Sequence, residues 1–132
     1  MVNYDINACG GDVSVNETTG YLESPNYPRN YTADTNCIWR LIAPENEQIS
    51  LKFLEDPNLE TGTVYDYVAI QNGLTEDSPL IGNYSGKKLP PEVRYVGNKL
   101  YVTFHSDLSS ELKGFRAVYS ISKYCLYSQS VR

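Results

Sequence analysis

Short runs of alternating apolar and polar residues are the feature of this chain that most constrains its fold. In the clearest run, Leu100, Val102 and Phe104 occupy every second position, whereas helical periodicity is hard to find. Side chains at alternate positions of a β-strand lie on one face of the sheet. Four further runs show the same pattern, with the apolar sets Cys37/Trp39/Leu41, Ile49/Leu51/Phe53, Val68/Ile70 and Phe115/Ala117/Tyr119. The sequence therefore predicts an all-β protein.

Turn signals separate these runs. They are Pro44-Glu45-Asn46, Asp56-Pro57-Asn58, Gln71-Asn72-Gly73, Pro90-Pro91 and Gly97-Asn98. Proline presets the backbone angle of a turn, and glycine and asparagine tolerate left-handed backbone, so such clusters end strands. Short alternating strands interrupted this regularly favour an antiparallel β-sandwich. The 132 residues have room for one such core.

Charge and hydropathy exclude two classes of partner. The formal net charge of −5 is opposite to the basic stripe that nucleic acid requires. It suits a cation or a basic protein partner, although mild acidity also serves solubility alone. The longest apolar runs are only a few residues, far short of the roughly 20 that a membrane-spanning helix needs, so no membrane insertion is expected.

The residues offer little for catalysis. The single histidine, His105, lies in His105-Ser106-Asp107, but neighbours on a strand point to opposite faces and cannot form a triad among themselves. A distant serine and aspartate could converge on His105, but nothing in the sequence marks them. One histidine and three cysteines also make a zinc site improbable. The sequence therefore favours a binding function over an enzyme.

Three sequons favour an extracellular location. Asn16, Asn30 and Asn83 each lie in an Asn-X-Ser/Thr pattern, which accepts N-glycans in secreted proteins. The three cysteines, Cys9, Cys37 and Cys125, cannot all pair within one chain.

Six short motifs, in a fixed order from Cys9 to Tyr119, resemble the CUB domain, an extracellular module of complement proteases, tolloid-type metalloproteases and receptors. The motifs are Cys9-Gly10-Gly11, Ser24-Pro25-Asn26-Tyr27-Pro28, Cys37-Ile38-Trp39, Tyr65-Asp66-Tyr67-Val68, Ser106-Asp107 and Gly114-Phe115. The resemblance implies a jelly-roll-like antiparallel β-sandwich and a non-catalytic binding module. It implies an N-terminal extension over residues 1–8, the domain over 9–121 and an exit segment over 122–132.

The resemblance also implies how the cysteines pair. Cys9 and Cys37 match the first bridge of the family, which closes a loop of 28 residues and would contribute roughly 3–4 kcal/mol. The second bridge is absent, because its positions fall near Thr63-Val64 and on Ser85. Cys125 lies beyond the module and is either free or bonded to a neighbouring domain or chain.

A calcium site is the main chemical implication. Calcium binds six to eight oxygen ligands, and calcium-binding CUB domains gather three acidic side chains at one end of the sandwich. Asp66 matches the second acid and Asp107 the third. Ser109 matches the residue that supplies a backbone carbonyl, and Tyr31 the tyrosine that supports the first acid.

The first acid is assigned to Glu60. The usual spacing before Asp66 falls on the neutral Asn58, and Glu60 lies two residues later in a stretch that resembles the acidic turn of the family. Glu55 and Asp56 are further candidates.

The expected function is calcium-dependent binding of an extracellular protein, with a Lys or Arg of the partner docked on the acidic end and Tyr27, Tyr31 and His105 as candidate rim residues. One alternative is a metal-free module that positions other parts of a larger secreted protein, for example a protease. Another is a glycan-binding module. Tyr65, Tyr67 and Tyr101, on outward strand positions, suit either an aromatic interface or simple β-propensity on a half-exposed face.

Overall fold

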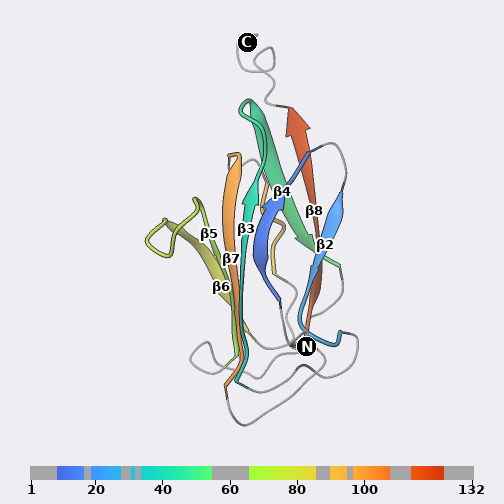
Figure 1. Ribbon diagram of the computed structural model, residues 1–132, viewed down its shortest axis with the longest axis vertical. Coiled ribbons are helices and arrows are strands. Elements are labelled where there is room, and N and C mark those ends of the chain that lie inside the picture. The colour runs from blue at the N-terminus through green and yellow to red at the C-terminus, as the bar shows by residue number, and fades with distance from the viewer. Residues whose placement is uncertain are drawn as a thin grey trace, which may run out of the picture.

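Eight strands in two facing sheets make up the described part of the chain (Figure 1). The computed structural model describes residues 9–16, 19–27, 31, 34–54, 66–85, 90–94, 97–107 and 114–123. The strands are β1 (Gly11–Ser14), β2 (Gly20–Glu23), β3 (Asn36–Ile42), β4 (Glu47–Phe53), β5 (Tyr67–Gln71), β6 (Leu80–Tyr84), β7 (Lys99–His105) and β8 (Arg116–Lys123). Within these residues no helix is long and apolar enough to cross a membrane. The predicted all-β sandwich is confirmed.

The larger sheet has the strand order β1-β3-β7-β5-β6, and the smaller one the order β2-β8-β4. All pairs are antiparallel except β1 and β3, which run parallel with Gly11 opposite Trp39. The exception arises because the chain leaves β1, forms β2 in the other sheet and returns to β3 in its original direction. The predicted domain boundary at residue 121 falls inside β8.

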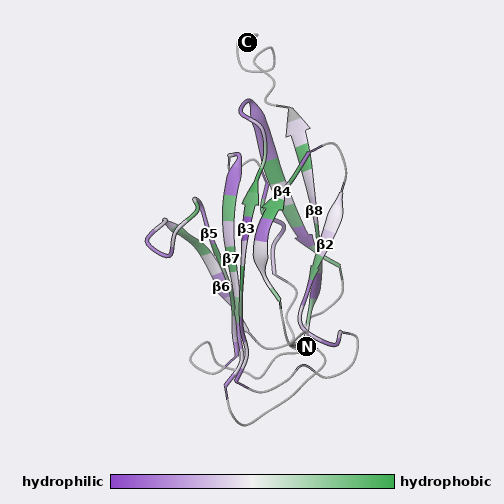
Figure 2. Cartoon of the chain, viewed as in Figure 1, coloured by the Kyte–Doolittle hydropathy of each residue, from purple (hydrophilic) through white to green (hydrophobic). Residues whose placement is uncertain are grey.

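The apolar faces predicted from the alternation meet between the sheets. β3 alternates strictly, with Cys37, Trp39 and Leu41 buried and the residues between them exposed. Figure 2 shows hydrophobic positions along β3, β4 and β7. Phe115 lies at the centre of an aromatic cluster, with the rings of Phe104, Phe53 and Trp39 at centroid distances of 5.5, 5.7 and 6.2 Å. Tyr119 is only partly buried and packs against the edge of this core.

A disulfide joins Cys9 to Cys37, as predicted, with their Cα atoms 5.2 Å apart. It fixes the chain before β1 to the buried face of β3. Cys125 lies outside the described residues.

Replacing both bridged cysteines by alanine is expected to lower the free energy of unfolding by roughly 3–4 kcal/mol, because the unfolded chain regains the entropy of an open 28-residue loop. Urea denaturation of the double variant measures this loss as a lower midpoint. A midpoint equal to that of the oxidised wild type would contradict it.

Candidate functional site

The sheet register brings two predicted ligands together. Asp66 directly precedes β5, and Asp107 lies two residues after the end of β7. Because β5 and β7 are antiparallel, with Tyr67 opposite His105, the start of one strand lies beside the end of the other. The backbone N–H of Asp107 donates a hydrogen bond to Oδ1 of Asp66, at 2.9 Å. We call this end of the sandwich, defined by Asp34, Asp66 and Asp107, the acidic corner.

Asp66 is fully buried, and each of its oxygens accepts a hydrogen bond. The hydroxyl of Tyr31 donates to Oδ2, while the backbone of Asp107 serves Oδ1. Tyr31 is itself fully buried, with its ring edge-on to Phe104 at 5.2 Å. Tyr31 was predicted to hold the first acid, Glu60, which lies outside the described residues; the contact seen is to Asp66.

The carboxylate of Asp66 has no basic partner in the part of the chain that the structure describes. None of the ion pairs there includes it. A buried charge without a counter-ion is strongly unfavourable, and hydrogen bonds offset only part of that cost. A carboxylate has about four lone-pair sites, so two remain for a cation after the two hydrogen bonds. The donor set therefore fits a hard metal ion such as calcium.

Hydrogen bonds between residues 34–35 and residues 106–107 fix the backbone around Asp107. The N–H of Asp34 donates to the carbonyl of Asp107 at 2.6 Å. Next to it, Thr35 and Ser106 exchange two hydrogen bonds: the Thr35 N–H donates to Ser106 Oγ at 3.0 Å, and the Ser106 N–H donates to the Thr35 carbonyl at 2.8 Å. Ser106 is thus a positioning residue, which explains the Ser-Asp pair of the sequence motif.

Asp34 is the acid that the sequence reasoning missed. It is exposed and has the left-handed backbone angle φ of 53°, which aspartate tolerates better than most residues. The available signal was an acidic residue in a short stretch between Tyr31 and the strand that begins at Asn36. Its position adds negative charge at the surface of the corner.

Residues of two further sequence motifs, Ser24 of one and Gly114 and Phe115 of the other, lie beside Tyr31. Ser24 and Phe115 are joined by hydrogen bonds from the Phe115 N–H to Ser24 Oγ at 3.0 Å and from the Ser24 N–H to the Phe115 carbonyl at 3.1 Å. Gly114 has φ of 89°, and a Cβ there would collide with Ser24 Oγ and lie 3.2 Å from the Tyr31 ring. Ser24, Gly114 and Phe115, from two of the sequence motifs, therefore pack beside Tyr31, the residue that holds Asp66.

Among the predicted ligands, Asp66 and Asp107 come together with Tyr31, while Glu60 and Ser109 lie outside the described residues. Of the sequons, Asn16 and Asn83 are exposed, and Asn30 is outside the described range. Within the described residues alone, no three His, Cys, Asp or Glu side chains are grouped to hold a metal. A complete site thus requires ligands from the neighbouring loops.

One prediction about the rim is wrong. Tyr31 was expected among the residues that surround a docked partner, but its side chain has no exposed surface. The reason is its bond to Asp66, which draws the ring into the core. His105 and Tyr27 are half-buried, and His105 stacks on Tyr67 with the ring centroids 5.2 Å apart.

The fold and the acidic corner define this chain as a disulfide-linked β-sandwich module. The family model described as "CUB domain" matches residues 9–119, and this chain belongs to that family. The family is extracellular and non-catalytic, and its members act as protein-interaction modules.

Relatives by sequence are much longer proteins. The chain is 42% identical over 110 residues to "Dorsal-ventral patterning protein tolloid" of Drosophila melanogaster, covering 83% of this chain and 10% of that protein. It is 35% identical over 120 residues to human "Cubilin", covering 88% of this chain and 3% of that protein.

Solved structures agree with the fold. The human MASP-1/3 CUB1-EGF-CUB2 structure matches with a TM-score of 0.75 and 25% identity, covering 86% of this chain and 42% of that one. The MASP-1 CUB2 domain bound to Ca2+ matches with a TM-score of 0.73 and 28% identity, covering 85% of this chain and 99% of that one.

Proposed function

We propose that this module binds an extracellular protein in a calcium-dependent manner, through the acidic corner. The observation that carries the proposal is Asp66, whose buried carboxylate is held by two hydrogen bonds and has no basic partner among the described residues. The calcium-bound structure of a 28% identical CUB domain supports it.

In this proposal Asp66, Asp107 and Glu60 supply the carboxylates, and Ser109 supplies a backbone carbonyl. Tyr31 holds Asp66 so that its oxygens are in place before the ion arrives, which lowers the ordering cost of binding. The bound ion supplies positive charge that offsets the clustered carboxylates and orders the loops that carry them.

The partner contributes a Lys or Arg side chain. Asp107 is partly exposed and Asp34 is exposed, so the corner presents acidic groups at its surface. A carboxylate of the corner that holds calcium through one oxygen has its other oxygen free to accept a charge-assisted hydrogen bond from the ammonium or guanidinium group of the partner. The net charge of −5 attracts a basic partner from a distance, and salt weakens that attraction.

Calcium titration by calorimetry on the oxidised protein tests the ion. We expect one site in the wild type and a loss of binding in Asp107→Asn. The matched control is Asp77→Asn, which makes the same change of charge at an exposed position of the β5–β6 loop, away from the corner, and should leave the titration unchanged.

The docking step is tested with a partner once one is identified. Its affinity should fall on chelation and on Asp107→Asn, and fall with added salt. Affinity insensitive to both changes would contradict the docking. Absence of calcium heat would instead favour a metal-free positioning role in a longer protein, and binding on a glycan array would favour carbohydrate recognition.

A further inference from the structure

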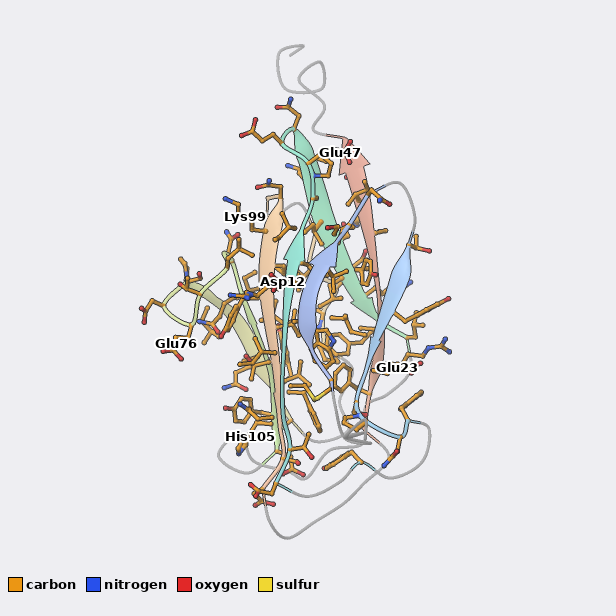
Figure 3. All side chains as sticks on the ribbon, viewed as in Figure 1. Asp12, Glu23, Glu47, Glu76, Lys99 and His105 are labelled. Atoms are coloured by element: carbon orange, nitrogen blue, oxygen red, sulfur yellow. A yellow bond between two sulfur atoms is a disulfide. The ribbon has the colours of Figure 1, made fainter. Side chains whose placement is uncertain are left out.

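The outer face of the larger sheet carries a groove that the acidic corner does not use. It has a volume of about 410 Å³ and is lined by residues that include Tyr67, Ala69, Leu80, Asn83, Tyr101 and Thr103. We call it the outer groove. Figure 3 labels Glu76 on the β5–β6 loop, which lies along one side of the groove, and His105, which packs against Tyr67 at the other.

The sheet register explains the shape of the groove. One row across the sheet runs Asn83, Ala69, Thr103 and Ile38, on β6, β5, β7 and β3. Its two middle residues are small and form the floor. The next row toward the corner holds Tyr67 and His105, and the row on the other side holds Tyr101 and Gln71, so larger side chains stand on both flanks.

A folded loop completes one wall. The side-chain amide of Gln71 donates to the backbone carbonyls of Glu76 and Ser78, at 2.7 and 2.9 Å. Thr75 and Ser78 add a turn within the loop, through bonds of 3.0 and 3.2 Å. These bonds hold the loop beside the outer face, where Leu80 is 61% exposed and Tyr101 only 8%.

The lining suits an uncharged, polar ligand with apolar faces. It combines two tyrosine rings and Leu80 with neutral amide and hydroxyl groups from Asn36, Asn83 and Thr103, and Glu76 is the one charged side chain among its described lining residues. A sugar ring presents C–H groups to the negative face of an aromatic ring and hydroxyl or acetamido groups to polar neighbours.

Asn83 places such a ligand at the mouth of the groove. It is exposed on β6, the edge strand of the sheet, and begins the sequon Asn83-Tyr84-Ser85 in a chain of an extracellular family. We propose that the N-glycan attached to Asn83 folds back and that its first N-acetylglucosamine residues occupy the outer groove.

Attachment follows ordinary N-glycosylation. The amide nitrogen of Asn83 loses a proton and bonds to C1 of the sugar, and the pyrophosphate of a lipid-linked oligosaccharide donor leaves with its lipid. Thr103, on the floor of the groove, lies two strand spacings from Asn83, roughly 10 Å, which is within reach of the first two sugars. Because the ligand is tethered, its effective concentration is millimolar and weak contacts hold it.

The test uses the chain secreted from eukaryotic cells. Glycopeptide mass spectrometry should find Asn83 occupied. NMR should show nuclear Overhauser contacts between the first sugars and protons of Tyr67 and Thr103. Enzymatic removal of the glycans should lower Tm by roughly 3–5 °C, the shift that about 1 kcal/mol gives in a domain of this size.

Two variants distinguish packing of the sugars in the groove from the mere presence of the glycan. Thr103→Tyr fills the floor, and Leu80→Ser removes an exposed apolar wall residue that the fold does not need. Both variants should keep the glycan on Asn83 but lose the sugar contacts and most of the difference in Tm between the glycosylated and deglycosylated protein. Asn16→Gln, the control, should keep the Asn83 glycan, its contacts and the Tm difference. An unoccupied Asn83, or an occupied one whose sugars contact no groove proton, would overturn the proposal.

Discussion

Asp66→Asn is expected to abolish calcium binding while leaving the calcium-free protein as stable as the wild type, or more stable. The asparagine can keep both hydrogen bonds, since its oxygen accepts from the Asp107 N–H and its amide donates to the Tyr31 oxygen. It removes a buried charge that has no basic partner in the described residues. It also removes a charged ligand, which should weaken calcium binding by more than the roughly 10–100-fold typical of an outer-shell change.

Thermal unfolding with chelator and with calcium separates the two effects. Free calcium at about 100 times Kd should stabilise the wild type by about 2.7 kcal/mol and leave Asp66→Asn unchanged. Asp77→Asn, the exposed control, should respond to calcium like the wild type. A large loss of stability of Asp66→Asn in chelator would show that the carboxylate is needed for the fold itself, against the prediction.

Trp39→Ala is expected to cost about 3–5 kcal/mol of unfolding free energy, the usual range for removing a large buried aromatic side chain. Trp39 is 7% exposed and packs edge-on against Phe115, at the junction of the two sheets. Urea denaturation followed by circular dichroism measures the loss, as a lower midpoint at unchanged slope.

Ile42→Ala is the matched control for this change, because it lies on the same strand but on the outer face and is 36% exposed. Its cost should stay near or below 1 kcal/mol. The single tryptophan also reports its own burial, so native emission at the wavelength of water-exposed indole would refute the core assignment.

Alternation was sufficient to predict the strands that face the core on one side. β3 follows it residue by residue, and in β7 the predicted inward positions Leu100, Val102 and Phe104 are all buried. β1, β2 and β6 were not predicted, because four or five residues at a sheet edge carry too little alternation to be distinguished from a loop. Tyr101 was assigned to an exposed or half-exposed face but is buried. It lies opposite Gln71, whose side chain holds the β5–β6 loop, and alternation along a strand does not encode how that loop folds.

For the site, the motifs predicted Asp66 and Asp107 as ligands, and the two do lie side by side, since each is next to a strand whose register fixes its place; their role as ligands stays a prediction. Motif matching did not identify Asp34, which reaches the corner only through a backbone hydrogen bond to Asp107. It also took Tyr31 for a surface residue, because the motif spacing gives the position of a tyrosine but not the direction in which its hydroxyl points. Such contacts depend on how separate loops pack.

The disulfide has a mechanical consequence. Cys9 and Lys123, the last residue of β8, lie at opposite ends of the sandwich. Cys9 is bonded to Cys37, near the start of β3, and Lys123 pairs with Glu47 at the far end of the other sheet. Tension applied between them passes from Cys9 directly into β3 and bypasses β1. It then acts along β3 and β8, both interior strands, at right angles to their hydrogen bonds. The bonds on either side of each strand bear the load together in shear, rather than opening one by one as a zipper does.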